Sequence, residues 1–163
     1  MKYFNYNLTN EDFTIEGNNH GYNCQYAFYK LHGLEFNPKH DEVDCWKGSD
    51  AVINGVGYSI KSHRARLSNC VEGETLAECI NNYLRMDASS VYVYCVYDDK
   101  AEIFHEFQMN EKEFREFAID RMSFTFDKRL NKWVARFRKD ITKKGRDLKN
   151  FNYLMAKVRD TNE

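Results

Sequence analysis

The chain has 163 residues, 42% of them hydrophobic, which is enough to bury the core of one domain without disulfides or a structural metal. The formal net charge is -1, but residues 121–163 hold 13 Lys and Arg against 5 Asp and Glu, so the C-terminal part is basic and the rest is acidic. The longest strongly apolar run, Val91–Tyr97, is too short to span a membrane, and the cysteines show neither CxxC spacing nor a preceding apolar signal segment, so we expect a cytoplasmic protein.

One domain over residues 1–163 is expected, because a single proline, no repeat and no Ser- or Gly-rich stretch mark a boundary. After a polar start, Asn18 or Asn19 can cap a first helix that runs to about His32, and Gly33 is placed to end it. The Tyr and Phe residues fall mainly at helix or strand periodicity, which indicates core packing rather than base stacking.

Three strands, a helix and a further strand are expected after the first helix. Asn54-Gly55 is the strongest signal, because this dipeptide favours the tight turn of a β-hairpin. The expected order is therefore αβββαβ within residues 16–97. The elements after the first helix are a weakly patterned strand near Val43–Trp46, the hairpin strands Asp50–Ile53 and Val56–Ser62, the helix Thr75–Met86 and the strand Ser90–Tyr97.

A C-terminal α+β extension of residues 98–163 is expected to follow this core. It begins with a strand and a helix, continues with a second hairpin, and ends with an amphipathic helix. The expected bounds are a strand near Ala101–Phe107, a helix capped by Asn110 and ending near Asp120, a hairpin of Ser123–Phe126 with Trp133–Phe137, and a helix over Asp147–Arg159.

The first hairpin brings charged side chains together. A two-residue turn at Asn54-Gly55 places Asp50 opposite Ser59, and Lys61 shares the face of Ser59 one diagonal step away. Asp50 could thus hold Mg²⁺ or Mn²⁺ while Lys61 stabilises phosphate charge or orients a water. An ordinary exposed Asp–Lys pair on a sheet face is the alternative.

Two short motifs on these elements resemble the PD-(D/E)XK superfamily of restriction-endonuclease-like nucleases. One is Asp50 followed by Ser59-Ile60-Lys61 on the hairpin; the other is Asn19-His20-Gly21-Tyr22-Asn23-Cys24-Gln25, which is similar to the N-x-G-x-x-x-E helix of many members. The αβββαβ order is also that of the family core. The resemblance implies a restriction-endonuclease-like α/β fold with a mixed sheet, and metal-dependent hydrolysis of phosphodiesters.

The family pattern assigns Gln25, Asp50, Ser59 and Lys61 to the catalytic site, but Gln25 and Ser59 stand where the family usually has acidic residues. Some members with a Ser-x-Lys motif recover the missing carboxylate from a Glu about 13 residues after the Lys, and Glu74 occupies that place. The resemblance therefore implies Asp50 and Glu74 as metal ligands. Glu74 in a first helical turn would also complement the helix dipole without any other role, and Gln25 could equally be a hydrogen-bonded, partly buried residue.

Basic residues after the hairpin suit contacts with nucleic-acid phosphates. His63, Arg64 and Arg66 follow the strand that carries Lys61, and a second basic stretch includes Lys143, Lys144 and Arg146. His63 could instead be a general base or a plain surface residue, and the second stretch could be a solvated helix face.

The sequence thus supports two main hypotheses. The first is a Mg²⁺- or Mn²⁺-dependent DNA endonuclease, for which a homodimer is expected because double-strand cleavage needs two active sites. The second is a catalytically inactive nuclease-fold module, phage or defence related, that binds DNA or a protein partner. A third alternative is an interaction domain whose acidic and basic parts mate between subunits.

Overall fold

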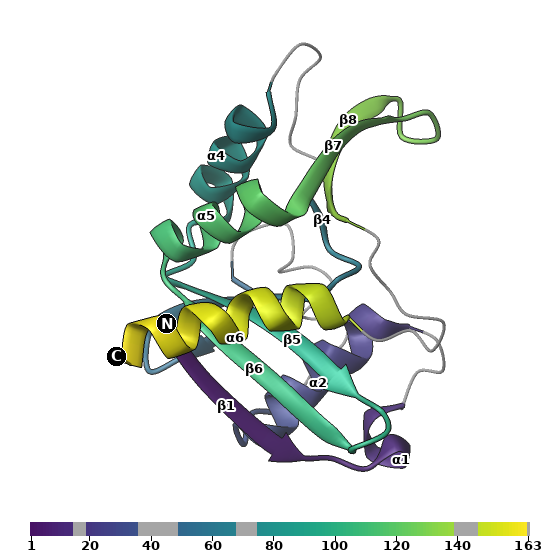
Figure 1. Ribbon diagram of the computed structural model, residues 1–163, viewed down its shortest axis with the longest axis vertical. Helices are drawn as coiled ribbons and strands as arrows, with labels where there is room; N and C mark the ends of the chain where they lie inside the picture. Colours follow the sequence, from purple (N-terminus) through teal and green to yellow (C-terminus); the bar gives the residue numbers. More distant parts are fainter. Residues whose placement is uncertain (15–18, 36–48, 68–74, 139–146, 163) are drawn as a thin grey trace.

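The computed structural model of the chain describes residues 1–14, 19–35, 49–67, 75–138 and 147–162 (Figure 1). It is an α/β protein with a mixed five-stranded sheet, a smaller three-stranded sheet and flanking helices. The elements are β1 (Lys2–Asn7), α1 (Asn10–Phe13), α2 (His20–Leu31), β2 (Ala51–Ile53), β3 (Val56–Lys61), β4 (Arg66–Leu67), α4 (Leu76–Asp87), β5 (Val91–Asp98), β6 (Ile103–Met109), α5 (Glu111–Arg121), β7 (Met122–Asp127), β8 (Lys132–Phe137) and α6 (Leu148–Asn162).

The helix starts follow from side-chain caps. The Asn19 side chain accepts a hydrogen bond from a backbone amide of the first turn of α2, which confirms the expected start of that helix. Thr75 and Asn110 each form a capping box with a Glu three residues on, at the start of α4 and α5. Gly33, just after α2, has a φ of +66°, a left-handed conformation in which glycine is favoured.

The large sheet has the strand order β1-β6-β5-β3-β2. The hairpin of β2 and β3 has the expected register, with Ala51 opposite Tyr58 and Ile53 opposite Val56 around the Asn54-Gly55 turn. β3 pairs in parallel with β5, and α4 is the crossover between them. The helix–hairpin–helix–strand order is confirmed; the strand expected near Val43–Trp46 lies outside the described residues.

Each face of this sheet covers a separate hydrophobic core. Alternate β5 residues point to opposite sides, so Tyr92 and Tyr94 pack with α4, α5 and α6, whereas Val93 and Cys95 pack with α1 and α2. In Figure 1, α6 crosses one face of the sheet and α2 lies behind the other. Residues of β3 alternate in the same way, which decides where its polar side chains lie.

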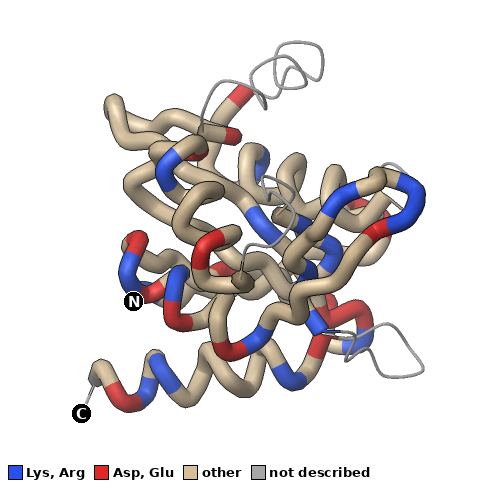
Figure 2. The backbone as a smooth tube through the Cα atoms, turned by 90° about the horizontal axis from the view of Figure 1, so that it is seen from above, with Lys and Arg blue, Asp and Glu red and all other residues tan. Residues whose placement is uncertain are grey.

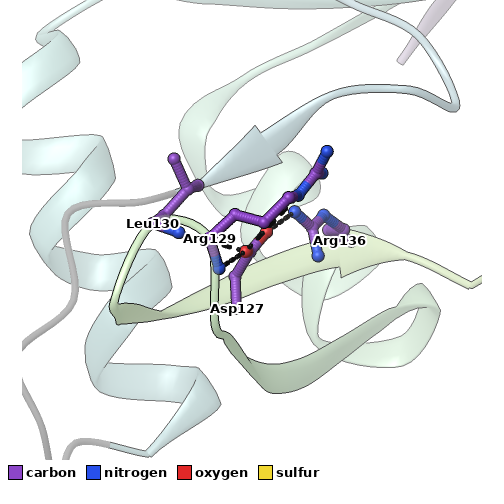
Figure 3. Close-up of polar contacts among 4 residues, drawn as sticks. All are labelled: Asp127, Arg129, Leu130 and Arg136. Atoms are coloured by element: carbon purple, nitrogen blue, oxygen red, sulfur yellow. Dashed lines mark hydrogen bonds and ion pairs between the residues drawn. The ribbon is translucent and has the colours of Figure 1, made fainter.

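The small sheet is a hairpin of β7 and β8 with β4 added at its edge. Asp127 closes the hairpin: its carboxylate accepts hydrogen bonds from the Arg136 guanidinium and from the backbone amides of Arg129 and Leu130, at 2.9 and 3.2 Å (Figure 3). The hydrogen bond from Arg136 is the main reason that the pKa of Asp127 is lowered to about 2. The turn is therefore held by an ionised carboxylate, and Asn131 completes it with a φ of +53°.

Some elements were not foreseen. β1 was expected to be a polar, irregular start, but it pairs antiparallel with β6 at the sheet edge, where the Tyr3 hydroxyl bonds to His105 Nδ1 at 2.7 Å. Arg66 and Leu67, expected in a basic loop, form β4 against β8. Among the helices that the structure describes, none is long and apolar enough to cross a membrane.

A buried polar network fastens α6 to the sheet. The Tyr94 hydroxyl donates to the Asp147 carboxylate and accepts from Asn150 Nδ2 at 3.0 Å, while Arg121 Nε donates to Asn150 Oδ1 at 2.7 Å. Tyr94, Asp147 and Asn150 are all buried. Each group depends on the others, because buried polar atoms without partners are costly.

We expect Tyr94→Phe to lower the free energy of unfolding by about 1–3 kcal/mol, because Asp147 and Asn150 would lose a buried partner. Tyr92→Phe is the matched control: the Tyr92 hydroxyl is buried and has no hydrogen-bond partner among the residues described, so its removal should be neutral or stabilising. Urea unfolding of both variants measures this difference, and equal destabilisation would contradict the network.

Candidate functional site

The polar residues of β3 lie on the face that is covered by α4. Ser59 is fully buried, and its hydroxyl donates to Asp87 Oδ2 at 3.1 Å. The same carboxylate accepts from the Tyr83 hydroxyl at 2.7 Å and from the amide and hydroxyl of Ser89. Ser59 therefore belongs to a buried hydrogen-bond network that joins β3 to the end of α4.

Lys61 lies one step further along this face and is half-buried. Its Nζ atom is 4.9 Å from the centre of the Tyr83 ring, a cation–π contact. Burial by itself lowers the pKa of Lys61, but Tyr83 and the Asp50 carboxylate outweigh it and hold the pKa above its ordinary value. Lys61 is therefore a fixed positive charge at neutral pH.

Asp50 stands next to this lysine, just before β2. Its Oδ2 atom accepts a hydrogen bond from the Ile60 backbone amide at 2.7 Å, and its carbonyl oxygen accepts one from the Tyr29 hydroxyl. The Asp50 carboxylate thus adds one hydrogen bond to β3 beyond the backbone pairing of β2 with β3. Asp50 and Lys61 are close enough for their charges to interact, as the expected register requires.

A pocket of about 240 Å³ opens where β3 ends. Gln25 reaches it from α2, on the opposite side of the sheet from the face that carries Ser59. The Nε2 atom of Gln25 is buried and has no hydrogen-bond partner within the described part of the chain. The residues that line the pocket are Gly21, Cys24, Gln25, Ile60, Lys61, Ser62, Arg64, Ala65 and Arg66.

The pocket is strongly basic. Lys61, Arg64 and Arg66 line it, and both arginines are exposed, whereas no acidic residue is among the described residues of its wall. Gly21 leaves open space at the start of α2, since a Cβ atom there would meet nothing within 4 Å. The wall therefore presents cationic donors, and Gln25, whose buried Nε2 atom has no partner among the described residues, adjoins them.

His63 lies beside this pocket rather than in its described wall. Its ring packs against His20 with 4.4 Å between the centroids. Burial first, and then the charges of His20 and Arg64, lower the pKa of His63 to about 4, so this side chain is neutral at neutral pH. Electrostatic contact with phosphate must therefore come from Lys61 and the arginines rather than from His63.

Cys24 also reaches the pocket wall from α2. Its thiol lies 3.5 Å from His20 Nε2, one helical turn away. Burial raises the pKa of Cys24, but hydrogen bonds with Cys95 and His20 outweigh it and lower the pKa overall. Cys24 is thus a polar residue of the pocket wall that is hydrogen-bonded to His20 outside that wall.

A metal site is not evident within the described residues, since no three His, Cys, Asp or Glu side chains there lie close enough to hold an ion. Asp50 and Asp87 are both near Lys61. The Asp87 carboxylate, however, already accepts hydrogen bonds from Ser59, Tyr83 and Ser89. The described residues therefore do not fit a divalent ion well. Glu74, Lys143, Lys144 and Arg146 lie outside the described residues.

Asp87 and Tyr83 are site residues that the sequence analysis missed as such. Tyr83 was placed on the apolar stripe of the helix, and Asp87 lay just beyond its expected end. A signal existed, because an acidic residue at the C-terminus of a helix opposes the helix dipole and so needs compensating donors. Ser59, Tyr83 and Ser89 are those donors.

Comparison of the chain with protein-family models, with curated proteins and with solved structures finds no match. What the chain does must therefore be inferred from its own residues.

An acidic residue in place of Ser59 should damage the fold. We expect Ser59→Asp to lower the free energy of unfolding by on the order of 3 kcal/mol, because the new carboxylate would be buried against Asp87. Adding Asp87→Asn should recover part of the loss, and Ser90→Asp, at an exposed position, should cost little. Urea unfolding measures all three, and a stable Ser59→Asp protein would contradict the description of this network.

Proposed function

We propose that this protein is a nucleic-acid-binding module with a restriction-endonuclease-like core, and that its basic pocket holds a phosphate group of the DNA backbone. The observation that carries the proposal is the convergence of Lys61, Arg64 and Arg66 with the unpartnered amide of Gln25 on one pocket. A cytoplasmic location, as predicted from the sequence, belongs to the same proposal, although Cys79 forms a disulfide, a bond more typical of oxidising compartments.

The chemistry of the wall favours a phosphodiester. Guanidinium groups bind phosphate oxygens through two parallel hydrogen bonds, and an ammonium adds a point charge. The Nε2 atom of Gln25 is a donor that an anion would satisfy. A pocket of about 240 Å³ is smaller than the roughly 300–1,000 Å³ of sites for free small molecules, which suits one group of a longer polymer.

The element order supports the restriction-like core. α2 precedes the β2–β3 hairpin, α4 crosses over, and β5 returns parallel to β3, as the αβββαβ pattern requires. In that pattern the residues at the end of the hairpin face the nucleic acid. Asp50 and Lys61 occupy those positions here.

Binding is favoured over catalysis because the carboxylates near Lys61 already accept hydrogen bonds from the protein. Asp50 accepts a bond from the β3 backbone, Asp87 is saturated by donors, and the family's usual acidic positions are Gln25 and Ser59. A weak or absent metal site is the consequence, because hard cations are held by several carboxylate or carbonyl oxygens.

The proposal predicts that Arg64→Ala with Arg66→Ala weakens binding of a labelled DNA duplex by roughly tenfold or more, since two charge-assisted hydrogen bonds to phosphate would be lost. The slope of log Kd against log salt should fall by about 2. Fluorescence anisotropy at several salt concentrations measures both quantities.

Lys157→Ala with Arg159→Ala is the matched control, because it removes the same charge from the end of α6, away from the pocket wall. Circular dichroism establishes that each variant is folded. Equal weakening by the two double variants would show a general charge effect and would contradict a phosphate site in the pocket.

Metal-dependent cleavage of DNA is the second candidate, and the proximity of Asp50 to Lys61 favours it. It requires Glu74 as a second carboxylate. The test is nicking of supercoiled plasmid in Mg²⁺ and in Mn²⁺ by the wild type beside Lys61→Ala. Nicking that is lost in the folded variant would establish nuclease activity. No cleavage by either protein would favour the binding module instead.

A further inference from the structure

Three aromatic rings lie together on the β7–β8 hairpin, where Phe124 packs against the edge of the larger core and Phe126 is exposed. Trp133 stacks on Phe124 with 5.2 Å between centroids and meets Phe126 edge to face at 5.8 Å. Phe126 is 43% exposed, and the other two rings are half-buried. The cluster of Phe124, Phe126 and Trp133 is called the aromatic platform below.

The strand register explains why the platform is exposed. Phe126 is directly opposite Trp133, and Phe124 is opposite Ala135, so all four side chains share one face. The inner end of that face, with Met122 and Ala135, packs in the core. The turn of the β7–β8 hairpin projects from the body of the molecule (Figure 1), and Phe126 at this outer end is exposed.

The hairpin that carries the platform is basic, with Lys128 and Arg129 in its turn and with Lys132 and Arg136 on the face opposite the rings. Residues 122–138 contain Lys128, Arg129, Lys132, Arg136 and Arg138 but a single acidic residue, Asp127. Figure 2 shows Lys and Arg gathered at the projecting tip of this hairpin. Asp127 pairs with Arg136 and, at 4.0 Å, with Arg129, whose side chain is nevertheless 86% exposed at the turn. The hairpin therefore carries a clear excess of positive charge next to its exposed rings.

The tip is also held in one conformation. Asp127 accepts bonds from the turn amides and from Arg136 on the facing strand (Figure 3), and the left-handed Asn131 completes the turn. Lys128 and Arg129 are thus presented from a fixed turn. Preorganised donors and rings lose less entropy when a ligand binds.

We infer that this hairpin is a second nucleic-acid contact, which binds single-stranded DNA or RNA by stacking unpaired bases on the aromatic platform and holding their phosphates with Lys128 and Arg129 of the turn. Exposed rings beside cations are the combination that single-strand binding uses, because every base has a face that can stack. The inference deepens the proposed function by naming unpaired bases as part of the ligand, and it depends on none of the pocket residues.

The fluorescence of Trp133 can report the stacking of bases on the platform. The sequence has two tryptophans, so Trp46→Phe leaves Trp133 as the sole tryptophan. Titration of this protein with a short oligothymidylate at low salt should quench its fluorescence. An abasic oligonucleotide of the same length, which has the phosphates without the bases, should bind more weakly and quench little.

Phe126→Ala should weaken binding of the oligothymidylate by about 5- to 100-fold, the usual effect of removing one stacking ring. Phe4→Ala is the matched control, because Phe4 is 40% exposed on β1 at the edge of the other sheet, and it should leave binding unchanged. The Arg64→Ala, Arg66→Ala protein separates the two sites: quenching by the single strand should persist there even when duplex binding is lost.

The absence of quenching, or an equal effect of Phe126→Ala and Phe4→Ala, would overturn the inference while leaving the pocket untouched. Analytical ultracentrifugation gives a second decisive outcome. Self-association that Phe126→Ala abolishes, without any quenching by oligonucleotide, would assign the platform to a contact between copies of the chain and would likewise overturn it.

Discussion

The parallel pairing of β3 with β5 is the constraint on which the candidate site depends. Parallel neighbours require a crossover, and α4 supplies it on the face that carries Ser59 and Lys61. Because the hairpin occupies the other edge of β3, the end of this strand is left next to the first turns of α2. The pocket forms there, with Lys61 from one face and Gln25 from the other.

The same constraint explains the polar network beneath the pocket. A serine inside the sheet must find a partner once α4 covers it, and Asp87 at the helix end is that partner. Tyr83, one turn earlier, donates to Asp87 and supports the Lys61 ammonium with its ring. Position 59 thus serves as a buried link between strand and helix.

Local signals were enough to predict the elements that carry the site. Asn19, Thr75 and Asn110 cap helices because their side chains reach backbone amides within the same turn, and Asn54-Gly55 fixes the hairpin register. β1 was missed because all six of its residues are polar or aromatic without regular alternation, and its stability comes from pairing with β6, about a hundred positions away.

The composition of the pocket could be predicted only in part. Lys61, Arg64 and Arg66 are close in sequence, so their proximity was foreseeable, whereas the meeting with Gln25 depends on how α2 packs against the sheet. The exposure of Phe126 and Trp133 was likewise hidden, because their strand periodicity is that of buried rings. Periodicity shows which residues share a face but not what covers that face.

The most direct test of the account is a nuclear magnetic resonance titration of isotope-labelled protein with a short phosphodiester, such as a thymidine dinucleotide. The account predicts that the largest shifts occur at the Gln25 side-chain amide and at the backbone amides of Gly21, Arg64 and Arg66, which line the pocket. Shifts confined to other surfaces, with the Gln25 amide unmoved at saturation, would contradict it.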